Sequence, residues 1–468
     1  MVLMRQGLLF RAVFMDGFID LLCGVLMTIM LTVCGVVLAL RIKLGRILTP
    51  REFIKTLRDS QTKDGISPFK AMCTALAGTL GVGNIAGVAT AITGGGAGAV
   101  FWMWIGAIVS MSVKYGEVVL AVKYRHRIGG RLIGGTMYTV RDGLKKLLGR
   151  RCAAVLGGAF ALLCIANSVI TGNVVQTNSA AAAISSLPEE VMGAILAVCI
   201  LIIGFVGAKR ITTLTSALIP PLSLIYVLMS MSVILRNMPL IPEIFADIFA
   251  GAFTPRAAVS GAVGMSVREA VKLGFTRGIF SNEAGCGTAP SAHAAAEAKS
   301  PHHQGCFGIF EVIADTLILC SMTAFVILIS GKKFGVFPSD GVPLTLDCFE
   351  ASLGIYAKEI IAWSVVLFAF ATVMAQLFYA DVALGYFNAS RTVRRTYVFV
   401  AAGAAFLGTV IDTGIMWKAA DLIVGLMTVI NVTVLLVMSG EIGDCSPYCN
   451  AKACEDLPSP SRRSVRIK

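Results

Sequence analysis

Two glycine-rich segments interrupt long apolar runs and carry the groups best suited to hold a small charged ligand. The first, TALAGTLGVGNIAGVATAITGGG, places GVGN at residues 81–84, and the second, FTRGIFSNEAGCGTAPSAHAAAEAK, places NEAGCGT at residues 282–288. Glycine costs about 1 kcal/mol relative to alanine in a helix interior. We therefore expect the backbone to be unwound at both segments. The alternative is that these glycines serve only close packing between helices.

Unwound backbone offers both kinds of group that a zwitterion needs. The N–H groups at the start of the following helix carry about half a positive charge and suit a carboxylate. The freed carbonyl oxygens suit a sodium ion or an ammonium group. Pro290, which favours the first turn of a helix, indicates where the second segment becomes helical again. This chemistry predicts a site for an amino acid with a cation beside it.

Three uncharged polar side chains in other apolar runs could complete such a site. Gln176, in GNVVQTNSAA with Asn173 and Asn178, could contact a ligand or could hydrogen-bond a neighbouring helix. Thr372 and Gln376, in FAFATVMAQ, form a polar stripe one helical turn apart. A hydroxyl with backbone carbonyls suits sodium, because hard cations prefer oxygen ligands. The alternative for Thr372 is a hydroxyl bonded back to the carbonyl four residues earlier.

Charged residues inside the apolar runs are expected to have mainly structural partners. Lys114 and Glu117 lie three residues apart on one helix face, which predicts a structural ion pair. Glu283 could bind a cation or the substrate, or it could cap a helix or pair with Arg277. His293 is expected to be a packed or interfacial imidazole.

The elements that must position these residues are helices that cross a membrane. Of the 468 residues, 56% are hydrophobic and 14% are charged, which is more apolar than a soluble domain can bury. A span needs roughly 20 apolar residues, and such runs recur, unlike the alternating strands of a porin. The predicted spans, about eleven in all, are 17–41, 67–92, 98–124, 152–184, 189–206, 211–237, 258–298, 305–331, 360–388, 396–413 and 417–439. Two amphipathic segments, 136–149 and 343–354, are expected at the interface.

The net charge of +13 is concentrated in loops that fall on one side if every span crosses once. These loops include RIKLGRILTPREFIKTLRDSQTK, KYRHRIGGR, SRTVRR and the tail SRRSVRIK. Because Lys and Arg favour cytoplasmic loops, we expect a multi-pass inner-membrane protein with its N-terminus outside and its C-terminus in the cytoplasm. Glu311, Asp315 and Asp381 would lie nearer the cytoplasmic ends, solvated or paired. No pattern predicts nucleic-acid binding, and the 13 Cys predict no disulfide framework.

The spans after the first divide into two groups of five, each of which begins with a glycine-rich break. Because a five-helix unit starts and ends on opposite sides of the membrane, two such units in sequence are inverted relative to each other. The expected segments are an N-terminal helix and basic loop at 1–66, two five-helix repeats at 67–237 and 238–440, and a disordered basic tail at 441–468.

Several long runs of the sequence resemble the alanine or glycine:cation symporter family. They are SPFKAMCTALAGTLGVGNIAGVATAITGGGAGAVFWMW, RGIFSNEAGCGTAPSAHAAA and NVVQTNS, and the similarity extends from about residue 17 to 440. The resemblance implies an all-α polytopic membrane protein of the LeuT type, with a five-plus-five inverted repeat and one extra N-terminal helix. It also implies sodium- or proton-driven uptake of a small neutral amino acid such as alanine or glycine.

The resemblance also places the binding residues by motif. Substrate contacts would come from both breaks and from amides on two other helices: Gly81, Val82, Gly83, Asn84, Gln176, Ala284, Gly285, Cys286, Gly287, Thr288 and Gln376. By analogy with the fold, the coupling sodium ion would lie between Thr372 and the backbone carbonyls of Gly78 and Gly81. The expected partners are therefore the amino acid, sodium and the lipid bilayer, with no other cofactor.

The chain departs from the family pattern close to these positions. The family usually has Thr where this chain has Val82, a hydroxyl residue where it has Ala371, and glycine where it has Ala375. Loss of a hydroxyl beside a ligand costs about 1–3 kcal/mol if a partner is left unpaired. Proton coupling, transport of another small solute, and an amino-acid sensor without transport are therefore alternatives. An enzyme is not expected, because the four His accompany no HExxH or GxSxG motif.

Overall fold

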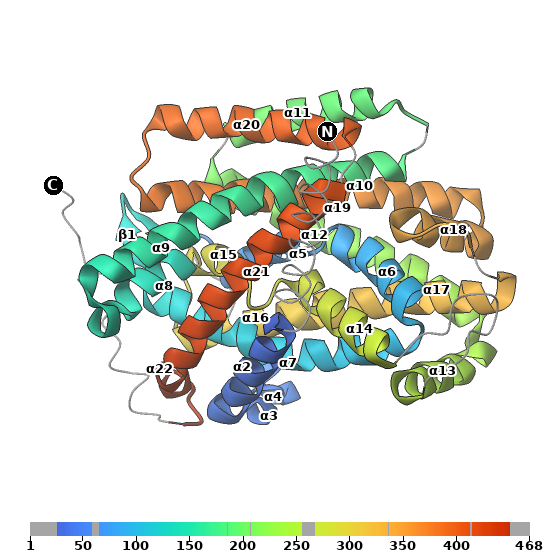
Figure 1. Cartoon of the computed structure of the whole chain (residues 1–468), viewed down its shortest axis with the longest axis horizontal. Coiled ribbons are helices and arrows are strands. Elements are labelled where there is room, and N and C mark those ends of the chain that lie inside the picture. Colours follow the sequence, from blue (N-terminus) through green and yellow to red (C-terminus); the bar gives the residue numbers. More distant parts are fainter. Residues whose placement is uncertain are drawn as a thin grey trace, which may run out of the picture.

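The computed structural model is mostly helical and describes residues 26–58, 65–184, 186–205, 207–254, 267–335, 337–411 and 414–449. Figure 1 shows long helices lying side by side in layers, with α11 (Glu189–Gly204) packed along α20 (Arg391–Val410) at one edge. Within these residues the β structure is one antiparallel hairpin, β1 (His126–Ile128) and β2 (Arg131–Ile133), and an isolated bridge between Ile66 and Ala296.

The N-terminal part and the first predicted repeat contain the following helices. Before the first break lie α2 (Met27–Ile42), α3 (Leu44–Ile47), α4 (Pro50–Arg58) and α5 (Pro68–Thr79). After it come η2 (Val82–Asn84), α6 (Ala86–Gly95), α7 (Gly98–Lys123), α8 (Thr136–Gly143), α9 (Lys145–Val169), η3 (Ile170–Val174), α10 (Val175–Ala183), α11 and α12 (Ala208–Arg236). Here η2 is a 3₁₀ turn, and η3 is a π-helical turn between α9 and α10.

The second predicted repeat begins with two short elements and then a broken helix. Its helices are η4 (Met238–Leu240), α13 (Ile241–Phe253), α14 (Val267–Asn282), α15 (Pro290–Ala294), α16 (Pro301–Val312), η5 (Ile313–Cys320), α17 (Ser321–Phe334), α18 (Gly341–Leu353), α19 (Ile355–Tyr386), α20, α21 (Gly414–Val437) and α22 (Ser439–Asp444). The element η5 is π-helical and joins α16 to α17. The helix α13 was not predicted from the sequence.

Six described helices are long and apolar enough to cross a membrane. They are Gly98–Lys123, Lys145–Ala183, Lys209–Arg236, Pro301–Phe334, Ile355–Tyr386 and Lys418–Val437, and the bent pair α5 and α6 makes a seventh if it is one span. The chain is therefore an all-α polytopic membrane protein. The predicted spans 17–41 and 258–298 begin outside the described residues. The count of eleven and the inverted repeat remain predictions, and the predicted tail lies outside the described residues from residue 450.

Local sequence signals explain where several helices begin. Ser67 caps α5 by accepting a hydrogen bond from the backbone of Lys70, and Pro68 occupies the first turn, where its missing N–H is not needed. Ser300 and Pro301 repeat this arrangement at α16. The segments predicted to be amphipathic are helical in the structure, as α8 with the start of α9 and as α18.

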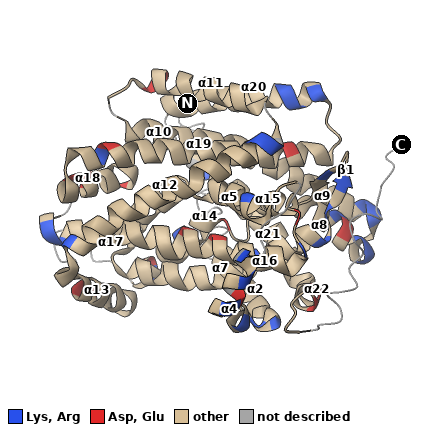
Figure 2. Ribbon diagram, turned by 180° about the vertical axis from the view of Figure 1, so that it is seen from behind, with Lys and Arg blue, Asp and Glu red and all other residues tan. Residues whose placement is uncertain are grey.

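The extra N-terminal helix α2 packs against α7 and α21. A side-chain carbon added to Gly35 would lie 2.3 Å from Val109, and Ser112 donates a hydrogen bond to the Gly35 carbonyl, so the two backbones approach closely. Figure 2 shows Lys and Arg gathered around β1, α8 and the start of α9, at the end of the molecule where α20 begins. This distribution agrees with the expected cytoplasmic side, although the orientation itself stays a prediction.

Candidate functional site

The first glycine-rich segment is unwound, as predicted. α5 ends at Thr79, α6 begins at Ala86, and the two helical arms are bent by 64°. In an intact helix Val82 would donate its N–H to the carbonyl of Gly78, but here it donates to Oε1 of Gln176 at 3.3 Å. The Gly78 carbonyl is therefore released from its helical donor at the end of α5.

Three residues predicted from separate parts of the chain meet at this break. A side-chain carbon added to Gly81 would lie 2.6 Å from Oε1 of Gln176 and 2.8 Å from Oγ1 of Thr372. Both side chains are buried, and they come from α10 and α19. Thr372 donates to the carbonyl of Phe368 at 3.1 Å, which is the back-bonded alternative. Its oxygen lone pairs can still face Gly81, since a hydroxyl accepts as well as donates.

Gln376 packs against the π-helical turn η3. A side-chain carbon added to Gly172 would lie 2.5 Å from Cγ of Gln376. Within the described part of the chain, neither Nε2 nor Oε1 of Gln376 has a hydrogen-bond partner, although the residue is 1% exposed. The hydroxyl of Tyr379, which packs against Gly78, is equally without a described partner. Buried polar atoms of this kind are costly unless a ligand or water satisfies them.

The space at the first break is small and mostly apolar. A cavity of about 10 Å³ is lined by Leu80, Gly81, Asn84, Ile85, Tyr226, Leu319 and Phe368. That volume holds about one water molecule. The structure therefore describes a closed arrangement, in which a ligand would have to displace the surrounding side chains.

A much larger hollow, of about 1190 Å³, opens between the β hairpin, the start of α12, the end of α19 and the start of α20. Its lining includes the basic side chains Arg131, Lys209, Arg391, Arg394 and Arg395 and the acidic side chains Glu297 and Asp381. Asp381 was expected to be solvated or paired, and it is paired with Arg394. The hollow reaches Leu377 and Phe378, the residues that follow Gln376 in α19. It is therefore a vestibule that reaches α19 from the basic end of the molecule.

The second glycine-rich segment is also unwound. α14 ends at Asn282 and α15 begins at Pro290, as the sequence predicted. Between them the backbone has positive φ at Glu283 (50°), Gly285 (88°) and Gly287 (80°). Glycine adopts this conformation without the steric cost that a side chain would add, which explains the two glycines.

The protein itself holds both polar groups of Gly285. Its N–H donates to Oε1 of Glu117 at 2.9 Å, and its carbonyl accepts from Nδ2 of Asn431 at 2.9 Å. Leu31 of α2 covers it, since an added side-chain carbon would lie 2.3 Å from that leucine. Asn431 and Leu31 were not predicted from the sequence. An amide within the apolar helix α21 was the available signal for the first, but a leucine in a helix gives none.

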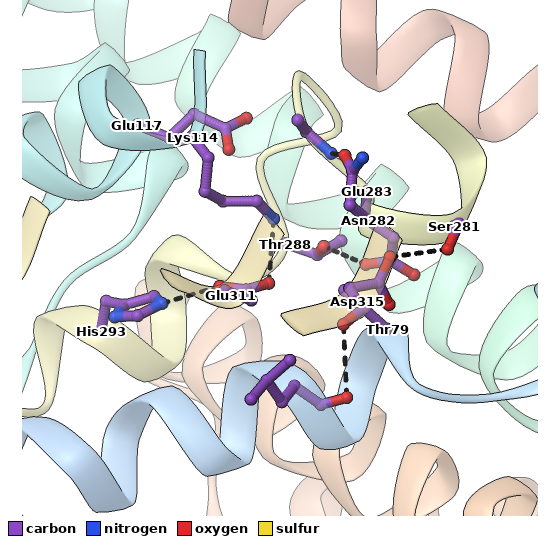
Figure 3. Close-up of polar contacts among 12 residues, drawn as sticks. Thr79, Lys114, Glu117, Ser281, Asn282, Glu283, Thr288, His293, Glu311 and Asp315 are labelled. Carbon is purple, nitrogen blue, oxygen red and sulfur yellow. Dashed lines mark hydrogen bonds and ion pairs between the residues drawn. The ribbon is translucent and has the colours of Figure 1, made fainter. Parts of the chain in front are cut away.

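The predicted ion pair between Lys114 and Glu117 is wrong. Lys114 forms its ion pair with Oε1 of Glu311 at 3.1 Å, and His293 contacts the other oxygen of Glu311 at 2.9 Å. Figure 3 shows both side chains pointing toward this carboxylate. The cause is geometric: α7 packs against α16, so Lys114 reaches a full counter-charge there, while Glu117 accepts from the second break. Glu311 was expected to be solvated or paired; it is completely buried and paired, so the second of these alternatives is confirmed.

His293 is a packed and not an interfacial imidazole. It is fully buried, and its Nδ1 lies 2.8 Å from Nε2 of Gln304. Glu283, the other undecided residue, accepts a hydrogen bond from Thr288 at 2.5 Å and so closes the loop between α14 and α15. It does not pair with Arg277. The remaining predicted contacts of this loop, Ala284 and Cys286, are buried.

Asp315 connects the two breaks and is not solvated, contrary to one sequence expectation. Its carboxylate accepts hydrogen bonds from Nδ2 of Asn84 at 2.8 Å and from Oγ of Ser281 at 2.6 Å. Figure 3 shows Ser281 directed at Asp315 beside the end of α14. Asn84, predicted as a substrate contact, therefore turns toward η5, while Gly81 faces Gln176 and Thr372. No structural observation tests ligand binding by any of these residues, so their roles remain predictions.

Comparisons with known proteins match nearly the whole chain. The sequence profile of the Sodium:alanine symporter family matches residues 10–455. The sodium/alanine symporter AgcS of Methanococcus maripaludis is 34% identical over 429 residues, which cover 90% of this chain and 93% of that protein. The probable sodium/glutamine symporter GlnT of Bacillus subtilis is 33% identical over 426 residues, which cover 90% and 87%. The amino-acid carrier protein AlsT of Bacillus subtilis is 34% identical over 379 residues, which cover 80% and 78%.

Proposed function

The chain belongs to the sodium:alanine symporter family, and we propose that it takes up alanine, glycine or a similar small neutral amino acid at the first break. It is a secondary transporter that couples small amino-acid uptake to sodium. The observation that carries the site assignment is the meeting of Gly81, Gln176 and Thr372. Gly81 lies in the break, Gln176 in α10 and Thr372 in α19, yet all three were selected from the sequence as ligand contacts.

The proposed pose follows from the polarity of the break. The carboxylate of the amino acid lies against the backbone N–H groups that follow Val82 in the break, at the positive end of α6, because those of Gly81 and Val82 donate to Thr79 and Gln176. Its ammonium group lies near Gln376, whose amide oxygen is buried and has no described partner. Gly81 and Gly172 bring backbone against these side chains, so only a small substrate side chain fits. The loop from Ala284 to Thr288 supplies the opposite wall.

Sodium is proposed to bind beside the substrate, between Thr372 and the carbonyls of Gly78 and Gly81. Two features support this assignment. The Gly78 carbonyl has lost its helical donor, because Val82 donates to Gln176. The hydroxyl of Thr372 lies against Gly81 and supplies a further oxygen. Hydroxyl and carbonyl oxygens are suitable ligands for a hard cation.

Transport is proposed to proceed by alternating access. The vestibule of about 1190 Å³ reaches α19 from the basic end, whereas the cavity at the first break is about 10 Å³. With the basic end in the cytoplasm, this is a state with a wide inner vestibule and a closed binding site. Rocking of one helical bundle against the other would open the site to each side in turn. Each sodium ion that crosses a potential of 100 mV supplies about 2.3 kcal/mol.

Uptake by the purified chain in proteoliposomes tests this function. Labelled alanine should accumulate under an inward sodium gradient and not under an equal potassium gradient. Unlabelled glycine and alanine should compete, and large or charged amino acids should not. Uptake that is indifferent to both sodium and pH would contradict the coupling. Uptake driven by a proton gradient alone would show that the coupling ion is the proton and not sodium.

A further inference from the structure

The vestibule at the basic end of the molecule carries more positive charge than its own acids neutralise. Both acids of its lining are already paired, Glu297 with Arg127 at 2.9 Å and Asp381 with Arg394. Among the described residues, the other basic side chains of the lining have no ion pair and no side-chain hydrogen bond. They are Arg131, Lys209, Arg391 and Arg395. The vestibule therefore has an excess of positive charge.

The positions of these cations are unfavourable for the protein alone. Arg391 and Arg395 lie four residues apart in α20, and like charges at this spacing repel each other. Lys209 and Arg391 lie in the first turns of α12 and α20, where the helix dipole already disfavours a cation. Cytoplasmic topology accounts for basic residues at this end of the molecule, but it does not require them to line one hollow. A bound anion would relieve these repulsions.

The vestibule lies at the depth where lipid headgroups are expected. The apolar span of α12 begins at Lys209, and the span of α19 ends at Tyr386, directly after Gly385 of the lining. Both positions therefore mark the boundary between the hydrocarbon core and water. The polar headgroups of a bilayer occupy the layer just outside the hydrocarbon core. A phospholipid phosphate would thus lie level with the cations of the vestibule.

One side of the vestibule is apolar and lies at the edge of the molecule. Phe205 and Phe399 belong to the lining, are 50% and 59% exposed, and have ring centroids 5.7 Å apart. Figure 1 shows their helices, α11 and α20, packed together at this edge. The helix ends are in close contact, since a carbon added to Gly204 would lie 2.3 Å from Cγ1 of Val398. Exposed phenyl rings beside unpaired cations suit a ligand with an anionic head and an apolar chain.

We propose that the vestibule binds an anionic phospholipid of the cytoplasmic leaflet. The phosphate is held by Arg391 and Arg395 of α20 and by Lys209 of α12, and an acyl chain lies along Phe205 and Phe399. Guanidinium groups match the geometry of phosphate oxygens, and basic pockets between membrane helices on the cytoplasmic side bind such headgroups. The leaflet follows from the predicted orientation. The inference goes beyond the proposed transport and requires neither its substrate nor its coupling ion.

The bound lipid would connect the two predicted repeats. Lys209 belongs to the first repeat, at 67–237, whereas Arg391 and Arg395 belong to the second, at 238–440. A headgroup that contacts both repeats at the mouth of the vestibule stabilises the arrangement described here, because a ligand favours the state that binds it. Anionic lipid should therefore raise the temperature at which the purified protein unfolds.

Lipid binding to the purified full-length chain tests the proposal. Native mass spectrometry in detergent compares dioleoylphosphatidylglycerol with dioleoylphosphatidylcholine, which has the same acyl chains and a neutral headgroup. The anionic lipid should bind about tenfold more tightly, and the double variant Arg391→Gln, Arg395→Gln should lose this preference. The control is Arg150→Gln, Arg151→Gln, which removes the same charge from exposed residues of α9 that do not line the vestibule. It should bind like the wild type.

Lys209→Gln is a second variant, on a different helix, and should weaken binding of the anionic lipid in the same direction. Equal affinity of the wild type for the two lipids would overturn the proposal. Unchanged affinity in both vestibule variants would also overturn it, as would an equal loss in the control, since attraction to the basic end as a whole would then suffice. Displacement of the lipid by inorganic phosphate or glycerol 3-phosphate would instead show a site for a soluble anion and contradict the lipid assignment. Alanine uptake enters none of these measurements, so failure of the proposed function is detected separately.

Discussion

The two breaks have the same cause in the sequence but opposite surroundings in the structure. The first, at residues 81–84, lies against uncharged side chains, chiefly Gln176 and Thr372, and several buried polar atoms near it have no described partner. The second, at residues 283–289, is held at Gly285 by Glu117 and Asn431 and is closed by its own residues. Glycine density therefore predicts where a helix unwinds but not what the unwound backbone does. We interpret the first break as the ligand site and the second as a wall held by the protein.

The largest expected effect comes from removing the charge next to the second break. Lys114→Met leaves the buried carboxylate of Glu311 without its cation, and loss of one partner from a buried pair costs about 3–5 kcal/mol. Denaturant unfolding of the purified protein in detergent measures this loss. The double variant Lys114→Met, Glu311→Gln should recover part of it, because the unpaired charge is removed. Wild-type stability in Lys114→Met would show that charge does not hold this region.

Gly81→Ala tests whether the first break is the substrate site. The new methyl group would lie 2.6 Å from Gln176 and 2.8 Å from Thr372, so both side chains must move away from the first break. We expect alanine uptake to fall by about 100-fold, as misplacement of binding groups by about 1 Å can do. Gly87→Ala in α6 is the control, because its methyl group meets open space. Equal uptake by both variants would show that Gln176 and Thr372 do not belong to the substrate site.

A smaller effect is expected at the proposed sodium ligand. Thr372→Ala removes one oxygen and should weaken the apparent sodium affinity by about tenfold. The alanine affinity measured at saturating sodium should change much less. The sodium dependence of uptake in proteoliposomes gives both values. A sodium affinity equal to that of the wild type would show that Thr372 is not a sodium ligand.

The helical architecture and both breaks could be predicted because their signals are local. Apolar runs mark most of the helices, and GVGN and NEAGCGT mark the breaks. The helix α13 was missed, because its 13 residues are too few for a span and carry Glu243 and Asp247. Gln176 was a candidate ligand contact because it is an amide in an apolar run, and the family resemblance assigned it to the same site as Gly81. No local pattern predicts that the two meet, since 95 positions separate them in the sequence.

The partners of buried charges could not be predicted in the same way. Spacing of three residues pointed from Lys114 to Glu117, but the observed partner, Glu311, is 197 positions away. The ion-pair partner of Lys114 depends on how α7 packs against α16, and no local sequence pattern encodes that packing. Asp315 shows the same limit, because its contacts to Asn84 and Ser281 arise only when the two broken helices come together.

The most direct test of the account is the thermodynamic coupling between alanine and sodium in the purified protein. Binding of alanine is measured by calorimetry across sodium concentrations, and binding of sodium across alanine concentrations. If the two ligands share the first break, each should raise the affinity for the other by the same factor, because linkage is reciprocal. Thr372→Ala should reduce that factor. Alanine binding that is equally tight with and without sodium would contradict the central claim.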